Sequence, residues 1–311
     1  TEILAGITTF LTMSYIIFVN PAILSTTGME HSAVFVATCL AAALGTLIMA
    51  FVANWPIGMA PGMGLNAFFA FTVVGAMGFT WQQALGAVFI SGVIFVILTV
   101  TGVRSWLIEG IPKSLRSAIA AGIGLFLAII ALGPAGAGIV VANEATIVGL
   151  GDLTAPATVF AILGFFVIAA LDALKVRGAI LIGIVAITIL SMITGHSEFQ
   201  GVFSAPPSLA PTFLQLDIMG ALHVGIVHVI LVLVLVEVFD ATGTLIGVAK
   251  RARLIEKGKP NRLGRALLAD STAIVAGSLL GTSSTTAYVE SASGVQAGGR
   301  TGLTALVISA L

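Results

Sequence analysis

Three acidic residues occur inside segments that are otherwise almost wholly apolar. Glu237 and Asp240 lie in the segment LVLVLVEVFDATGTLIG, and Glu290 lies in the segment LLGTSSTTAYVESASGV. A carboxyl near the centre of a lipid bilayer destabilises an inserted helix by at least about 2.5 kcal/mol, so it needs a cavity lined by protein. Because residues three apart share a helix face, Glu237 and Asp240 can both point to one side. Carboxyls placed in this way can bind a polar ligand, or bind and release a proton during a cycle.

Basic partners for these acids are missing from the apolar segments, since every Lys and Arg falls in a connection between them. The carboxyls are therefore expected either to accept hydrogen bonds from backbone and hydroxyl groups or to include at least one protonated group at rest. The alternative for Asp240 is that it only ties helix ends together.

Two other segments contain residues that suit a lipid-facing helix poorly. GMAPGMGLNAFFAF at 58–71 is rich in Gly and Pro, and GTSSTTAYVESASGV at 281–295 is rich in Ser and Thr. Irregular backbone is tolerated inside a membrane where it is buried in protein or lines a cavity. We expect half-helices that begin near Leu65 and near Val289, whose free N–H groups and dipoles point at a polar ligand. The alternative is that the glycines only allow close helix packing.

The composition is that of an integral membrane protein. Of 311 residues, 58% are hydrophobic and 8% are charged, and the mean hydropathy is +1.15. Apolar runs long enough to cross about 30 Å of hydrocarbon recur along the chain. The expected spans are 3–24, 33–54, 64–79, 82–101, 116–134, 154–172, 178–195, 219–249, 266–281 and 285–298, with a further span that starts at 301. A formal net charge of zero and the absence of a basic stripe give no indication of a nucleic-acid partner.

The connections between these spans predict the orientation. All thirteen basic residues fall in connections that lie on one side if the N-terminus is cytoplasmic, as the positive-inside rule requires. The basic run KRARLIEKGKPNRLGR at 250–265 is then a cytoplasmic loop and not a site. The two interrupted segments each follow two spans, so spans one to three and eight to ten correspond. Seven spans per repeat would invert the second repeat, an arrangement that places a binding site near the midplane.

Four motifs together resemble one transporter family. APGMGLNAFF, EVFDATGTL, TSSTTAYVESASGV and the opening AGITTFLTMSYIIFVNP are similar to the nucleobase cation symporter 2 group, in its adenine, guanine and hypoxanthine permease branch. The resemblance implies an all-α polytopic membrane protein with a uracil-permease-like fold of seven plus seven inverted spans. It also implies short strands in spans 3 and 10 that meet at the centre, with a purine between them.

The same resemblance divides the chain into domains. Residues 1–116 would form spans one to four of a core domain, 117–195 spans five to seven of a gate domain, and 219–311 spans eight to eleven of the core. Because the family has fourteen spans, the chain is expected to be incomplete after span 10 or 11.

Carried over residue by residue, the resemblance implies a purine site. It places Gly64 and Asn66 at the span-three side and gives substrate and proton-coupling roles to Glu237, Asp240 and Glu290. The backbone amide of Val289 is a further donor. Which of Glu237 and Asp240 contacts the base stays open, because alignment on the charged residue and alignment on Gly243 give different answers. A neutral purine offers N–H donors and N and O acceptors that these groups can pair.

The function that follows is uptake of guanine, hypoxanthine or adenine by proton symport across a plasma membrane, such as a bacterial inner membrane. No cofactor or metal is implied, and no P-loop, metal cluster or nucleophile motif predicts an enzyme. Sodium as the coupling ion and a homodimer stay open. The alternatives are a uracil or xanthine permease of the same fold, an anion carrier, or a channel; the acidic residues count against the anion carrier.

Overall fold

The computed structural model describes residues 1–104, 113–134, 136–143, 146–176, 178–197, 205–222, 224–256 and 259–311. These residues form two compact units, the first made of 1–120 and 206–311 and the second of 121–205. Among the thirteen basic residues, Arg177 and Lys257 lie outside the described part of the chain.

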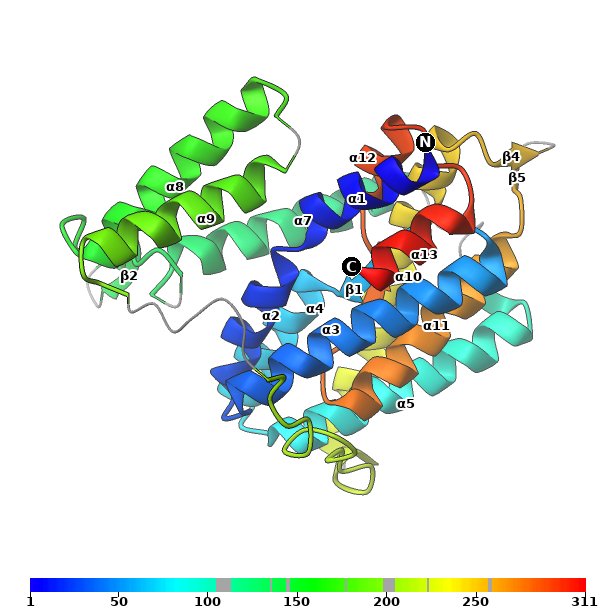
Figure 1. Ribbon diagram of the computed structural model, residues 1–311. Coiled ribbons are helices and arrows are strands. Elements are labelled where there is room, and N and C mark those ends of the chain that lie inside the picture. Colours follow the sequence, from blue (N-terminus) through cyan, green and yellow to red (C-terminus); the bar gives the residue numbers. More distant parts are fainter. Residues whose placement is uncertain are drawn as a thin grey trace. The chain divides into compact units, whose positions relative to one another are not determined.

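The first unit is built almost entirely from apolar helices. They are α1 (Glu2–Met13), α2 (Ile16–Ser25), α3 (His31–Ile48), η1 (Met49–Ala53), α4 (Met63–Ala67), η2 (Phe68–Ala76), α5 (Trp81–Val100), η3 (Gly220–Leu222), α10 (Val224–Arg251), α11 (Leu263–Leu280), α12 (Ser291–Gln296) and α13 (Gly302–Ala310). Helix α11 lies between α3 and α5 and packs against both (Figure 1). Many leucine, isoleucine and phenylalanine side chains on the outer faces stay exposed, as expected where lipid rather than water is the solvent.

Helices long enough to cross a membrane match the apolar runs of the sequence. Over the described residues they are Glu2–Ser25, His31–Ala53, Trp81–Val100, Pro156–Ala173, Val227–Arg251 and Leu263–Leu280, with shorter apolar helices at Met63–Ala76 and Ala179–Ile193. The first of these is interrupted between α1 and α2, so that Ser14 and Tyr15 stand at a break. A break of this kind exposes polar groups that a continuous helix would bond internally.

Two short strands lie at the centre of the first unit. Strand β1 (Met59–Pro61) lies between η1 and α4, and strand β6 (Thr285–Ala287) lies between α11 and α12. The two strands are antiparallel neighbours, which confirms the predicted meeting of strands from spans 3 and 10. The predicted half-helix starts are corrected, because α4 begins at Met63 and α12 begins at Ser291.

Strands also occur where the sequence predicted only connections. In the second unit, β2 (Val140–Asn143) and β3 (Ile147–Leu150) form a hairpin, and in the first unit β4 (Ile255–Glu256) pairs with β5 (Lys259–Pro260). These pairs add to an otherwise helical fold. Strands of two to four residues are too short to give a periodic pattern that a reading of the sequence can recognise.

The second unit contains a pair of packed helices. Helices α8 (Pro156–Ala173) and α9 (Ala179–Ile193) lie against each other, and α7 (Lys113–Leu132) runs into this unit from the first. Asp152, in the connection before α8, accepts hydrogen bonds from the hydroxyl and the amide of Thr154. These bonds hold the pKa of the exposed Asp152 carboxyl below its ordinary value.

Candidate functional site

The β1–β6 pair is a buried crossing of two segments that are far apart in sequence. Met59, Ala60 and Pro61 face Ala287, Thr286 and Thr285, and every residue of both strands is buried. At one end the amide of Gly62 donates to the carbonyl oxygen of Ser284 over 2.8 Å, and at the other the amide of Tyr288 donates to Gly58 over 3.0 Å. The crossing thus satisfies backbone groups that lipid could not.

Gly62 allows the two strands and a carboxyl to approach closely. A Cβ atom on Gly62 would lie 2.9 Å from the Cγ2 atom of Thr286 and 3.9 Å from the Oδ2 atom of Asp240. Asp240 of α10 therefore lies directly beside the start of α4. Its carboxylate is also close enough to those of Asp270 and Glu290 for the negative charges to repel one another.

Glu237 lies one helical turn before Asp240 and is almost completely buried, with 2% of its surface exposed. Its Oε1 atom is 3.5 Å from the hydroxyl oxygen of Ser91 on α5, and Ser284 lies beside the carboxylate as well. Its Oε2 atom has no hydrogen-bond partner among the described residues. Both carboxyls of α10 therefore point toward the strand crossing, as their spacing predicts.

Glu290 follows β6 in a turn and directly precedes α12. The hydroxyl group of Tyr15, at the break between α1 and α2, donates to Glu290 Oε1 over 2.9 Å. The neighbouring Val289 has a side chain that is 64% exposed. The hydroxyl of Tyr288 donates to the carbonyl oxygen of Pro61 over 2.5 Å, so β1 and β6 are also joined by a side chain.

Asn66, on α4, has a side chain that is already engaged within the protein. Its Nδ2 atom donates to Asn20 Oδ1 over 2.5 Å, and its Oδ1 atom accepts a hydrogen bond from Ser283. Asn20 in turn donates to the hydroxyl oxygens of Thr38 and Thr282, over 2.6 and 2.9 Å. Gly64 lies in the same half-helix. The structure thus places Asp240 beside Gly62 and within electrostatic range of Glu290, and it directs the Asn66 amide into a buried polar network.

The sequence analysis did not predict one buried ion pair. Arg104 donates from Nη2 to Asp270 Oδ2 over 2.7 Å, and both side chains are fully buried. Arg104 pairs with Asp270 and not with Glu237, Asp240 or Glu290, although its charge lies within electrostatic range of Glu237. Asp270 could have been recognised as the other acids were, since it lies in the apolar run predicted at 266–281. Arg104 could not have been recognised in this way, because it lies just beyond an apolar run.

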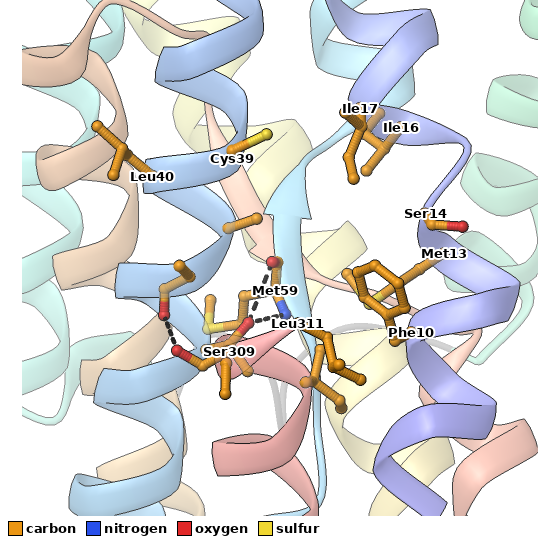
Figure 2. Close-up of a pocket in the computed structure, with 15 residues that line it drawn as sticks. Phe10, Met13, Ser14, Ile16, Ile17, Cys39, Leu40, Met59, Ser309 and Leu311 are labelled. Carbon is orange, nitrogen blue, oxygen red and sulfur yellow. Dashed lines mark hydrogen bonds between the residues drawn. The ribbon is translucent and has the colours of Figure 1, made fainter. Parts of the chain in front are cut away.

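A cavity of the first unit is lined by none of these acids. It has a volume of about 240 Å³ and is lined mainly by apolar side chains from α1, α2, α3, β1 and α13. Figure 2 shows Phe10 and Met13 on one side and Cys39 and Leu40 on the other, with Met59 of β1 between them. Ser309 closes it from α13 by donating to the carbonyl oxygen of Ala43 over 2.8 Å. None of the six predicted site residues lines it.

The paired strands β1 and β6 lead into the short helices α4 and α12, and carboxyls from α10 flank the pair. This arrangement is typical of transporters and not of a catalytic centre. Over the described residues, no group of three or more His, Cys, Asp or Glu side chains is arranged to hold a metal ion. The model of the Permease family matches residues 1–311, and the chain belongs to this family. The family predicted from the four motifs is thereby confirmed, and its members are permeases rather than enzymes.

Similar proteins share the whole length of this chain. A putative permease of Methanocaldococcus jannaschii is 53% identical over 312 residues, and this match covers 100% of this chain and 71% of the relative. The adenine permease AdeP of Escherichia coli is 50% identical and is covered to 70%. The guanine/hypoxanthine permease PbuO of Bacillus subtilis is 46% identical and is covered to 73%. Both of these matches also span 100% of this chain.

Two solved structures are similar in fold. The transmembrane domain of the cyanobacterial bicarbonate transporter BicA superposes with a TM-score of 0.69 at 16% identity, covering 99% of this chain and 80% of that one. SLC26A9 superposes with a TM-score of 0.59 at 11% identity, covering 99% and 52%. At these identities the likeness shows the fold alone: a multi-pass membrane protein with the architecture of these transporters.

Proposed function

We propose that this permease takes up purine bases by proton symport. The supporting observation is the strand crossing itself, with Asp240 beside Gly62, Glu290 just after β6 and within electrostatic range of Asp240, and Glu237 one helical turn before Asp240. Relatives named as adenine permease and as guanine/hypoxanthine permease are 50% and 46% identical over the whole chain, which favours a purine as the substrate. Sequence and geometry leave the choice among adenine, guanine and hypoxanthine to experiment, since one polar contact can reverse such a preference.

The proposed contacts follow the chemistry of a neutral purine. Its ring N–H groups would donate to the carboxylates of Glu290 and of Asp240 or Glu237, and the amide of Val289 would donate to a ring acceptor. Val289 suits this role because no hydrogen bond from its amide is formed within the described part of the protein. Gly64 and Asn66 would shape the opposite side, with Asn66 held in place by its bonds to Asn20 and Ser283.

Proton coupling is proposed for the same three acids, Glu237, Asp240 and Glu290. Mutual repulsion between Asp240 and Glu290 would favour uptake of a proton on the outer side, and binding of the purine would then complete the loaded state. Residues 1–116 and 219–311 would move as a core domain against a gate domain at 117–195, with the N-terminus in the cytoplasm. Release of purine and proton to the cytoplasm completes the cycle.

The test is uptake of radiolabelled adenine, guanine and hypoxanthine by the full-length protein in proteoliposomes, with and without an imposed pH gradient. We expect accumulation that depends on the gradient and is abolished by Glu290→Gln. Glu30→Gln is the matched control, because Glu30 is exposed and makes no side-chain cap bond at the start of α3.

Four outcomes would change the proposal. Unchanged accumulation by Glu290→Gln would remove Glu290 from the mechanism. Accumulation that follows a sodium gradient instead would replace the coupling ion. Uptake of uracil or xanthine without purine uptake would support the alternative permeases, and equilibration without accumulation would indicate a channel.

A further inference from the structure

Arg104 is buried four residues after the end of α5 and is held from several directions. Its Nη1 atom donates to the carbonyl oxygen of Leu267 over 3.0 Å and to the hydroxyl oxygen of Ser271 over 2.9 Å. Its guanidinium carbon lies 4.3 Å from the centre of the Phe95 ring. Together with the ion pair to Asp270, these contacts fix the guanidinium against one face of α11. Because the guanidinium group is planar and its hydrogen bonds are directional, these contacts hold it in one orientation.

Asp270 connects this arginine to strand β6. One carboxylate oxygen accepts from Arg104, and the other, Oδ1, accepts from the hydroxyl of Thr286 over 3.2 Å. The backbone amide of Ala287 lies close enough to this carboxylate to favour its charge. Asp270 thus holds a side chain of the strand that leads, within three residues, to Glu290.

The electrostatic setting of the pair extends to the proposed purine site. The charge of Arg104 attracts Glu237, and the charge of Asp270 repels both Glu237 and Asp240. The ion pair is therefore coupled electrostatically to two of the predicted site acids, through Arg104 and Asp270 for Glu237 and through Asp270 for Asp240. Burying an ion pair brings no reliable gain in stability over well-packed apolar side chains, so stability alone is a weak reason for its presence.

We propose that Arg104 is a positioning residue of the transport site: through Asp270 it holds β6 so that Val289 and Glu290 face the substrate. This proposal rests on the proposed function. The path runs from Arg104, beyond the end of α5, through Asp270 of α11 to Thr286 in the strand pair. Neither Arg104 nor Asp270 needs to touch the purine for the device to work.

Thr286 offers the sharpest test, since its hydroxyl joins Asp270 to β6 without belonging to the ion pair. Thr286→Val keeps the shape and removes the bond, whereas Thr286→Ser keeps the hydroxyl. We expect Thr286→Val to raise the KM for purine uptake about tenfold, equivalent to about 1.4 kcal/mol, and Thr286→Ser to restore most of the affinity. Thr272→Val is the matched control on α11, because the Thr272 hydroxyl bonds only to carbonyl oxygens of its own helix.

A double variant separates positioning from stability. Arg104→Met combined with Asp270→Leu replaces the pair by apolar side chains of similar size, which commonly preserves folding. We expect this variant to insert and to unfold at a temperature near that of the wild type, but to take up purine with a KM raised about tenfold or more. Thermal unfolding and size-exclusion profiles in detergent provide the folding readout.

The outcomes distinguish this proposal from the proposed function. Wild-type protein that takes up no purine would overturn the proposed function. If the wild type transports and Thr286→Val matches Thr272→Val in KM, the positioning role is refuted. Wild-type KM in a folded double variant would equally show that the pair serves stability alone.

Discussion

The buried amide pair Asn20–Asn66 allows a quantitative test of how the crossing is held. Asn20 takes part in three side-chain hydrogen bonds and Asn66 in two bonds to oxygen atoms, with one bond shared between them. At a net value of about 1 kcal/mol for each bond, Asn20→Ala should lower the free energy of unfolding by about 3 kcal/mol and Asn66→Ala by about 2 kcal/mol. The double variant should lose about 4 kcal/mol, because the shared bond is counted once.

The assay is reversible unfolding of the purified protein by SDS titration in mixed micelles, followed by circular dichroism. Ser25→Ala is the control on the same helix, since the Ser25 hydroxyl bonds only to the Ala22 carbonyl oxygen one turn away. It should change the free energy of unfolding by less than about 0.5 kcal/mol. Additivity of the two asparagine variants within about 0.3 kcal/mol would show that their amides do not interact, and the reasoning would fail.

Two further predictions concern the strands and the carboxyl that they present. Gly62→Ala should impair uptake strongly, because the new Cβ atom would lie 2.9 Å from Thr286 Cγ2. Gly243→Ala on α10 is the control and should transport normally, because no atom beyond its own helix backbone and chain neighbours lies within 4 Å of that Cβ position. Equal uptake by both variants would contradict the close approach at Gly62. Tyr15→Phe should raise the KM for purine several-fold by removing the bond that orients Glu290, and Tyr288→Phe, which loses a bond to Pro61, should mainly lower thermal stability. A Tyr15→Phe variant with wild-type KM would show that this bond does not orient the carboxyl.

The membrane-spanning helices and the two interrupted segments were predictable from the sequence for a simple physical reason, whereas the strands within those segments were implied by the family resemblance. Long apolar runs have few alternatives to a helix in lipid, and clusters of Gly, Pro, Ser and Thr within them mark backbone that must be satisfied by protein. The exact first residues of the half-helices were harder to predict from the sequence. Because a turn follows β6, α12 begins at Ser291 rather than near Val289, and turn geometry depends on contacts such as that between Ser291 and Gly58.

The acids of the candidate site were equally accessible, because lipid penalises a carboxyl wherever it falls in a span. Asp270 satisfied this criterion as well, and the charge of Arg104 could not be assigned to it from sequence because 166 positions separate the two residues. The hydrogen-bond network around Asn20 could not be predicted either, because its members are also far apart in the sequence. Its members come from α2, α3, α4 and the approach to β6, and uncharged amides and hydroxyls carry little penalty that would single them out in a span.

Antiparallel pairing of β1 and β6 explains why residues from both ends of the chain converge on one centre. Two corresponding segments that cross in opposite directions send their following helices, α4 and α12, to opposite sides, while their entrances stay together at the pair. Each outer edge of this narrow ribbon then needs its own partner. Thr46 of α3 bonds the backbone of Met59 on β1, and Asp270 of α11 accepts a hydrogen bond from the hydroxyl of Thr286 on β6. A neutral hydroxyl suffices on one edge, whereas the other edge has a charged group whose counterion, Arg104, follows α5 by four residues. The asymmetry places a buried charge beside the strand that leads to Glu290, and under the proposed function this is the side where a titrating carboxyl would need the most exact placement.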